Sequence, residues 1–119
     1  MTATVLVVDD DPDIRLTLRQ ILREEGLRVC EARNGLEALE KIAEEEPDLV
    51  LLDLIMPVID GWEVLRMLRK ARRNLPIVVV SAVPADGCAD FIQKPVSFKR
   101  LLQLLELIRA RVNEPPSSV

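Results

Sequence analysis

The sequence predicts an α/β fold in which helices cover both faces of a parallel sheet. Short apolar runs rich in β-branched residues alternate with stretches of helical periodicity. The apolar runs are continuous, as in strands that are buried on both faces. The chain has 119 residues, of which 49% are apolar and 30% charged. This length and composition are typical of one globular domain.

The first half of the chain contains three expected strands and two expected helices. Asp11 is suited to cap a helix and Pro12 to occupy its first position. Apolar residues then recur every three or four positions until Gly26, which ends the helix. Asn34-Gly35 leads into a second amphipathic helix, which Pro47 ends. The expected strands are residues 4–8, 27–32 and 49–52.

The second half continues the same alternation. Asp60 begins a capping box for a third helix. The tail at 113–119 is rich in Pro and Ser and is expected to be flexible, so the domain comprises residues 1–112. The remaining expected elements are a loop at 54–59, a strand at 77–80, a brief strand at 91–92 and a last helix from Ser97 to about Val112.

The composition excludes several classes of function. The chain has no His, which rules out a Ser-His-Asp or Cys-His nucleophile and a His-ligated zinc site. It has no Gly-rich phosphate loop, and a net charge of −4 argues against nucleic acid as the main ligand. We see no membrane-spanning run, no signal peptide and no metal or redox spacing for Cys30 and Cys88. We therefore expect a cytoplasmic protein with reduced thiols and no membrane partner.

Polar residues stand at the ends of four expected strands. Asp9-Asp10 follow the first strand, Asp53 the third, Ser81 the fourth and Lys94 the fifth. The carboxyl ends of parallel strands meet at one edge of the sheet, where ligands bind. Clustered carboxylates repel one another unless a cation such as Mg²⁺ neutralises them. The sequence therefore predicts a magnesium-dependent phosphoryl site with Asp53 as its nucleophile.

These motifs resemble those of response-regulator receiver domains, the phosphorylated modules of bacterial two-component signalling. The resemblance covers residues 1 to about 112 and implies a flavodoxin-like, doubly wound sheet of five parallel strands in the order 2-1-3-4-5. The segments that carry it, in the order in which the family has them, are Val7-Val8-Asp9-Asp10-Asp11, Asp53-Leu54-Ile55-Met56-Pro57-Val58-Ile59-Asp60-Gly61, Ser81-Ala82 and Lys94-Pro95.

The resemblance implies a chemical role for the acidic residues. Asp53 matches the phosphoacceptor, which takes a phosphoryl group from the phosphohistidine of a sensor kinase. Asp9 and Asp10 match the acidic pair that holds Mg²⁺, to which Asp53 and the backbone carbonyl of Ile55 would also be ligands. Such a domain is not an enzyme, apart from the magnesium-dependent phosphorylation and dephosphorylation of its own Asp53.

The resemblance also implies a switch. Ser81 matches a hydroxyl that moves to the phosphoryl oxygen, Lys94 matches the ion-pair partner of the phosphate, and Phe91 matches an aromatic rotamer switch. Taken singly, each has an ordinary explanation: Ser81 as a turn residue, Lys94 as a surface lysine and Phe91 as part of the core. Their joint occurrence at strand ends is what indicates chemistry.

The sequence departs from the family between Ser81 and Phe91. Only nine residues, 82–90, connect the two strands, and they include Pro84 and Gly87. A crossover between parallel strands normally takes about 10 to 12 residues or more, including its helix. We therefore expect only four full helices, with the family's fourth helix missing or reduced to a turn. Loss of that helix should uncover apolar sheet and favour a homodimer or partner docking there.

Three functions remain open from the sequence. The leading one is a receiver without an output domain, which accepts phosphate from a sensor histidine kinase or phosphotransfer protein and signals to a downstream protein by contact. The second is a receiver-like scaffold for protein–protein interaction that is insensitive to phosphorylation. The third is a magnesium phosphatase similar to the dehalogenase family, which would need an Asp where this chain has Ile55.

Overall fold

The structure is a computed structural model, and strands and helices alternate along it as expected from residue 4 to residue 81. It describes residues 3–54, 56, 58–71, 75–81, 91–94, 99–103 and 105–106. The shortened connection at 82–90 and the tail at 113–119 lie outside these residues, so the expected helix count and tail remain predictions. The elements are β1 (Thr4–Val8), α1 (Pro12–Glu24), β2 (Arg28–Ala32), α2 (Gly35–Glu45), β3 (Leu49–Leu52), α3 (Gly61–Ala71), β4 (Ile77–Ser81) and β5 (Phe91–Gln93), followed by helical residues at 99–103 and 105–106.

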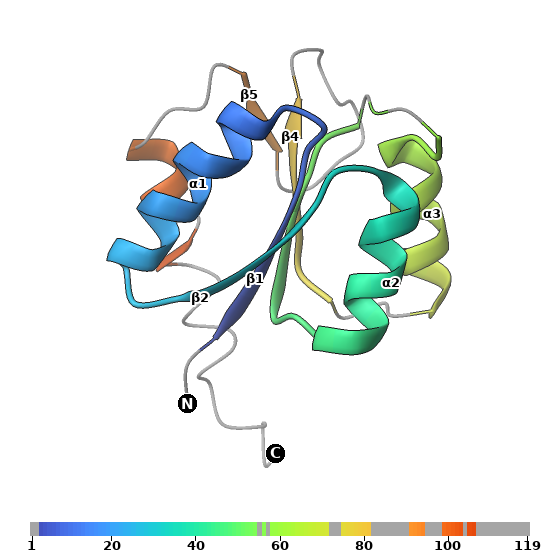
Figure 1. Ribbon diagram of the computed structural model, residues 1–119, viewed down its shortest axis with the longest axis horizontal. Coiled ribbons are helices and arrows are strands. Elements are labelled where there is room, and N and C mark those ends of the chain that lie inside the picture. The colour runs from blue at the N-terminus through green and yellow to red at the C-terminus, as the bar shows by residue number, and fades with distance from the viewer. Residues whose placement is uncertain are drawn as a thin grey trace, which may run out of the picture.

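The strands form one sheet in the order β2-β1-β3-β4-β5, and every neighbouring pair is parallel. The predicted α/β architecture is therefore confirmed. Helix α1 and the helical residues near 100 lie on one side of the sheet, while α2 and α3 lie on the other (Figure 1). Because β1 and β3 lie inside the sheet, the residues that follow them come out near its middle.

Two apolar cores flank the sheet. Alternate side chains of β1 point to opposite faces, and all four residues from Val5 to Val8 are buried. This explains why the strand reads as one continuous apolar run. On the first face Val5 and Val7 pack with Leu18, Leu22, Leu101 and Leu105. On the second face Leu6 and Val8 pack with Ala38, Ile42, Val64 and Leu68.

A side-chain cap begins each of the helices α1, α2 and α3. Asp11 accepts a hydrogen bond from the backbone N–H of Asp13 at 2.9 Å, and Asp60 accepts one from Glu63 at 3.0 Å. Asn34 caps α2 in the same way, by accepting from Glu37 at 2.9 Å. The predicted capping roles of Asp11 and Asp60 are confirmed. These caps satisfy backbone donors that a helix leaves free at its first turn.

The expectation that the short connection uncovers apolar sheet is wrong at β4. All five residues of β4 are at most 3% exposed. Val79 is covered from the α3 side by Leu54 and Leu65. Leu54 directly follows Asp53 in the expected loop, and it is fully buried and covers part of this face. Because β4 is buried, it offers no exposed apolar surface that would favour a homodimer.

Val58 has a strained backbone, which predicts a stabilising substitution. Its φ is 73°, although it is β-branched, and its side chain is 76% exposed. A left-handed conformation costs an L-residue about 1–2 kcal/mol, whereas glycine adopts it freely at an entropic cost of about 0.5–1 kcal/mol. We expect Val58→Gly to raise the free energy of unfolding by about 0.5–1 kcal/mol, measured from urea midpoints at unchanged slope. Val58→Ala keeps the positive φ and should give no such gain; a gain as large as that of glycine would contradict the prediction.

Candidate functional site

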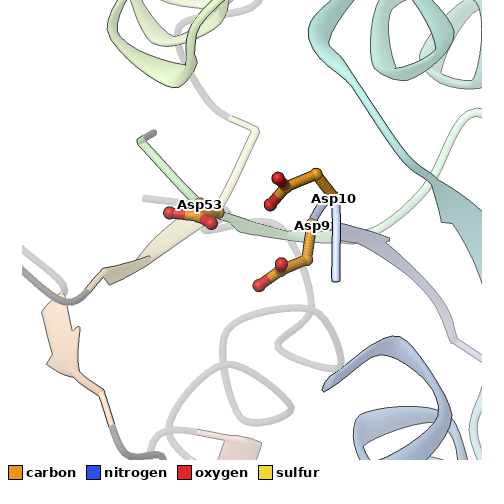
Figure 2. Close-up of side chains that lie close together, drawn as sticks. All are labelled: Asp9, Asp10 and Asp53. Atoms are coloured by element: carbon orange, nitrogen blue, oxygen red, sulfur yellow. The ribbon is translucent and has the colours of Figure 1, made fainter. Parts of the chain in front are cut away.

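Strand pairing brings Asp9 and Asp53 to the same edge of the sheet. Val8 and Leu52 are register partners, and each is followed by one of the two aspartates. The backbone N–H of Asp53 donates to the carbonyl of Val8 at 3.0 Å. Figure 2 shows the carboxyl groups of Asp9, Asp10 and Asp53 gathered around one region. One oxygen from each of the three lies within 4.8 Å of the others.

The acidic cluster differs in burial from one residue to the next. Asp9 is 2% exposed and Asp53 is 5% exposed, whereas Asp10 is exposed to solvent. The Nζ atom of Lys94 lies 2.9 Å from Asp9 Oδ2 and 3.1 Å from Asp53 Oδ2. Lys94 carries one positive charge and contacts two of the three carboxylates of the cluster.

Burial and charge shift the pKa values of Asp9 and Lys94. Burial raises the pKa of Asp9 above its ordinary value of 3.8, although the N–H of Asp11 and the charge of Lys94 oppose this. Burial alone would lower the pKa of Lys94, but hydrogen bonds and charges from Asp9 and Asp53 outweigh it and raise that pKa above 10.5. The pKa of Asp9 is therefore raised chiefly because burial disfavours the charged form of its carboxyl group, and the charge of Asp53 adds the smallest contribution.

Ser81 and Lys94 are linked through the backbone. Ser81 is the last residue of β4 and is fully buried. Its carbonyl accepts a hydrogen bond of 2.8 Å from the N–H of Lys94, which directly follows β5. Ile55 lies outside the described residues. Of Phe91 only the backbone is described, opposite Val79 in the sheet, so the predicted carbonyl ligand and aromatic switch are not tested.

The three carboxylates fit a magnesium ion. All donors are oxygen atoms, which hard divalent cations prefer. The exposed position of Asp10 leaves one side of the cluster open to solvent, and Mg²⁺ characteristically keeps several water ligands. Asp9, Asp10 and Asp53 are therefore the residues that would hold this ion.

Helix α3 begins directly against the backbone of the central aspartate. The N–H of Gly61 donates to the carbonyl of Leu54 at 2.8 Å. A Cβ atom at position 61 would meet the carbonyl group of Asp53 and the Cα of Leu54. Only glycine leaves room for this contact, so α3 supports the segment that carries the aspartate.

The parallel sheet carries the acidic cluster and Lys94 at its carboxyl edge, where ligands bind in folds of this kind. Residues 5–106 match the family model of the response regulator receiver domain, and the chain belongs to this family. It is therefore a receiver domain of two-component signalling. No helix in the part of the chain that the structure describes is long and apolar enough to cross a membrane.

Curated relatives are full-length response regulators. The chain is 38% identical over 120 residues to the response regulator MprA of Mycobacterium ulcerans, a match that covers 93% of this chain and 52% of the relative. The identity to MprA of Mycobacterium tuberculosis (strain H37Ra) is also 38%, with the same coverage. The chain spans about half the length of the curated relatives that it matches.

Solved structures support the same family. A CheY-like receiver domain from Methanospirillum hungatei has a TM-score of 0.87 at 30% identity, covering 97% of this chain and 100% of that one. The receiver domain of Francisella response regulator 1452 has a TM-score of 0.86 at 30% identity, with 94% and 100% covered. The BeF3-activated DrrB receiver domain has a TM-score of 0.83 at 26% identity, with 93% and 100% covered.

Proposed function

We propose that this receiver domain is a phosphoacceptor in a phosphorelay and that Asp53 takes the phosphoryl group from a phosphohistidine. The observation that carries the proposal is the placement of Asp53 within 4.8 Å of two further carboxylates and 3.1 Å from Lys94. Receiver domains of this family interact with histidine kinases or phosphotransfer proteins. The donor would therefore be one of these.

The residues of the site suit an in-line transfer. A carboxylate oxygen of Asp53 attacks phosphorus, the new P–O bond forms and the P–N bond to the donor histidine breaks. Asp9, Asp10 and Asp53 would hold a Mg²⁺ ion, which would supply charge neutralisation at the phosphoryl oxygens when bound. Lys94, which contacts both Asp9 and Asp53, is placed to exchange a carboxylate partner for a phosphoryl oxygen.

The response to the phosphoryl group would involve the end of β4. Ser81 would donate its hydroxyl to a phosphoryl oxygen, Phe91 would change its rotamer, and the carbonyl of Ile55 would complete the metal site. The new charge of about −2 on the acyl phosphate biases these groups. A downstream protein would read the change by direct contact.

Acetyl phosphate tests the proposal. After incubation of the full chain with Mg²⁺ and acetyl phosphate, intact mass spectrometry should show the gain of one phosphoryl group, and Asp53→Asn should abolish it. Asp48→Asn is a matched control, because Asp48 accepts a hydrogen bond from the N–H of Thr4 at the start of β1, away from the site. This control should be labelled like the wild type. An unlabelled wild type, or equal labelling of Asp53→Asn, would contradict the proposal.

The short connection between β4 and β5 favours a second candidate, a receiver-like scaffold that does not switch. Titration with Mg²⁺ and beryllofluoride, followed by NMR, separates the two, since beryllofluoride activates a similar receiver domain. Shifts that extend from Asp53 to the amides of β4 and β5 support a switch. Shifts confined to residues around Asp9, Asp10 and Asp53 support the scaffold.

A further inference from the structure

An arginine on α1 reaches back to the acidic cluster. The Nη1 atom of Arg15 donates a hydrogen bond of 2.7 Å to the backbone carbonyl of Asp9, and its Nε lies 3.3 Å from Oε1 of Glu31. We propose that Arg15, held by Glu31, positions the Asp9–Asp10 segment for metal binding. The inference rests on the proposed function of that segment.

The hydrogen bond from Arg15 to the Asp9 carbonyl affects the orientation of the Asp10 side chain. The carbonyl oxygen of Asp9 and the N–H of Asp10 belong to one planar peptide unit. Fixing this oxygen therefore sets the plane from which the Asp10 side chain departs. Asp9 is held at other points as well: its N–H donates to the carbonyl of Ala32 at 3.1 Å, and its Oδ1 accepts from the N–H of Asp11 at 2.9 Å. Asp10 is the exposed member of the cluster and depends most on its backbone for orientation.

Glu31 fixes the position of the Arg15 guanidinium group and offsets its charge. It lies on β2 as the register partner of Val7, close to the end of β1. Its second oxygen accepts from Nη1 of Arg19 at 2.8 Å, so two arginines fix one carboxylate. The charge of Glu31 offsets that of Arg15. The rigid guanidinium can then contact a carbonyl without competing with a cation for Asp9 and Asp10.

A simple surface ion pair does not explain this arrangement. The Arg15 and Glu31 side chains are only 18% and 27% exposed, and Arg15 also contacts the backbone of a metal-site residue. An exposed pair contributes little to stability and nothing to a distant site. A positioning role predicts that removing Arg15 or Glu31 weakens Mg²⁺ binding, whereas a structural ion pair would change only the stability of the fold. The affinity for Mg²⁺ must therefore be measured separately from that stability.

Mg²⁺ titration of the full chain by calorimetry tests the inference. Arg15→Met and Glu31→Gln should each raise the Kd for Mg²⁺ by about tenfold, the low end of the usual effect of removing groups that orient metal ligands. The double variant should bind about as weakly as either single one, because the two residues act as one unit. Arg15→Lys should lie between wild type and Arg15→Met, since lysine keeps the positive charge but lacks the planar fork that places Nη1 and Nε on two different partners.

The exposed pair Lys41 and Glu44, whose Nζ and Oε2 atoms lie 4.0 Å apart, provides the control. Lys41→Met and Glu44→Gln should leave the Kd for Mg²⁺ unchanged. As a second readout, the amide signal of Asp10 in the metal-free protein should shift in Arg15→Met and Glu31→Gln, but not in the controls. Should Arg15→Met fail to fold, Glu31→Gln carries the test.

Two negative results have different meanings. If wild type binds Mg²⁺ and the Arg15 and Glu31 variants bind it equally well, the positioning role is wrong and the proposed function stands. If wild type itself does not bind Mg²⁺, the proposed function is wrong and the positioning role falls with it.

Discussion

Gly61→Ala is expected to lower the free energy of unfolding by about 3 kcal/mol, the upper end of the usual cost of overpacking. The new Cβ would lie against the carbonyl oxygen of Asp53 and the Cα of Leu54, and 2.8 Å from the Asp53 carbonyl carbon. These are backbone atoms, so no side chain can rotate away. Either α3 or the segment that carries Asp53 must move. Urea unfolding measures the loss of stability, and the rate of labelling by acetyl phosphate measures the displacement of Asp53.

Alanine substitutions at two other glycines serve as controls, because they introduce strain away from Asp53. At Gly35 a Cβ would meet the carbonyl oxygen of Ile59 and lie 2.8 Å from a methyl group of Val64. Gly35→Ala should be destabilised without a direct push on Asp53. Gly26 has a φ of 81° and open space around it, so Gly26→Ala should cost only about 1 kcal/mol. After correction for the folded fraction of each variant, acetyl phosphate should label only Gly61→Ala more slowly than wild type. Labelling of Gly61→Ala at the wild-type rate would contradict a displacement of Asp53.

Lys94→Met is expected to destabilise the metal-free protein by about 2 kcal/mol at pH 7. Removing one partner of a buried ion pair typically costs about 3–5 kcal/mol, and we reduce this because the Lys94 side chain is 17% exposed. The substitution removes the ammonium group that contacts both Asp9 and Asp53. Urea unfolding in a metal chelator measures the loss, and added Mg²⁺ should stabilise the variant by replacing the missing positive charge.

The pH dependence of this loss has a definite sign. The pKa of Lys94 is raised above 10.5 in the folded protein, so its stabilisation is present below that pH and is lost as the pH rises through the raised value. The pKa of Asp9 is raised above 3.8, and without Lys94 it should rise further. Its charged form then costs stability at pH 7, and this cost disappears as the pH falls toward 3.8. The difference between wild type and variant should therefore shrink in both directions from pH 7.

An exposed ion pair between a lysine and a glutamate provides the control for Lys94→Met. Lys41 lies 4.0 Å from Glu44 on the surface of α2. Lys41→Met should change the free energy of unfolding by less than about 0.5 kcal/mol, with no dependence on Mg²⁺. If Lys94→Met is as mild as Lys41→Met, the ammonium group does not hold the two buried carboxylates in the way proposed.

The central part of the site could be predicted because it depends on local signals. A continuous apolar run ends at Val8 and another at Leu52, and an aspartate follows each. Parallel pairing of such runs brings their ends together whatever the details of the packing. The caps Asp11 and Asp60 were also local signals, since each is a short polar side chain just before an amphipathic stretch.

The supporting residues could not be predicted, because their contacts depend on register and packing. Arg15 and Glu31 have the sequence character of ordinary surface charges, and they meet only because β2 lies beside β1 with Glu31 opposite Val7. Leu54 lies in a loop, as the sequence predicts, but its burial against Val79 has no local signal. The positive φ of Val58 has no signal in a β-branched residue.

The position of β1 and β3 inside the sheet has a consequence for amide hydrogen exchange. Asp9 and Asp53 directly continue these two strands, which carry the most deeply buried residues. Amides of such central strands exchange only when the whole domain opens. An ion or phosphoryl mimic bound at this edge should therefore slow exchange across all of β1 and β3 by one common factor. In β5, which lies at the edge of the sheet, local opening costs less free energy than unfolding of the whole domain. Binding should therefore slow exchange of the β5 amides by factors that differ from one amide to the next.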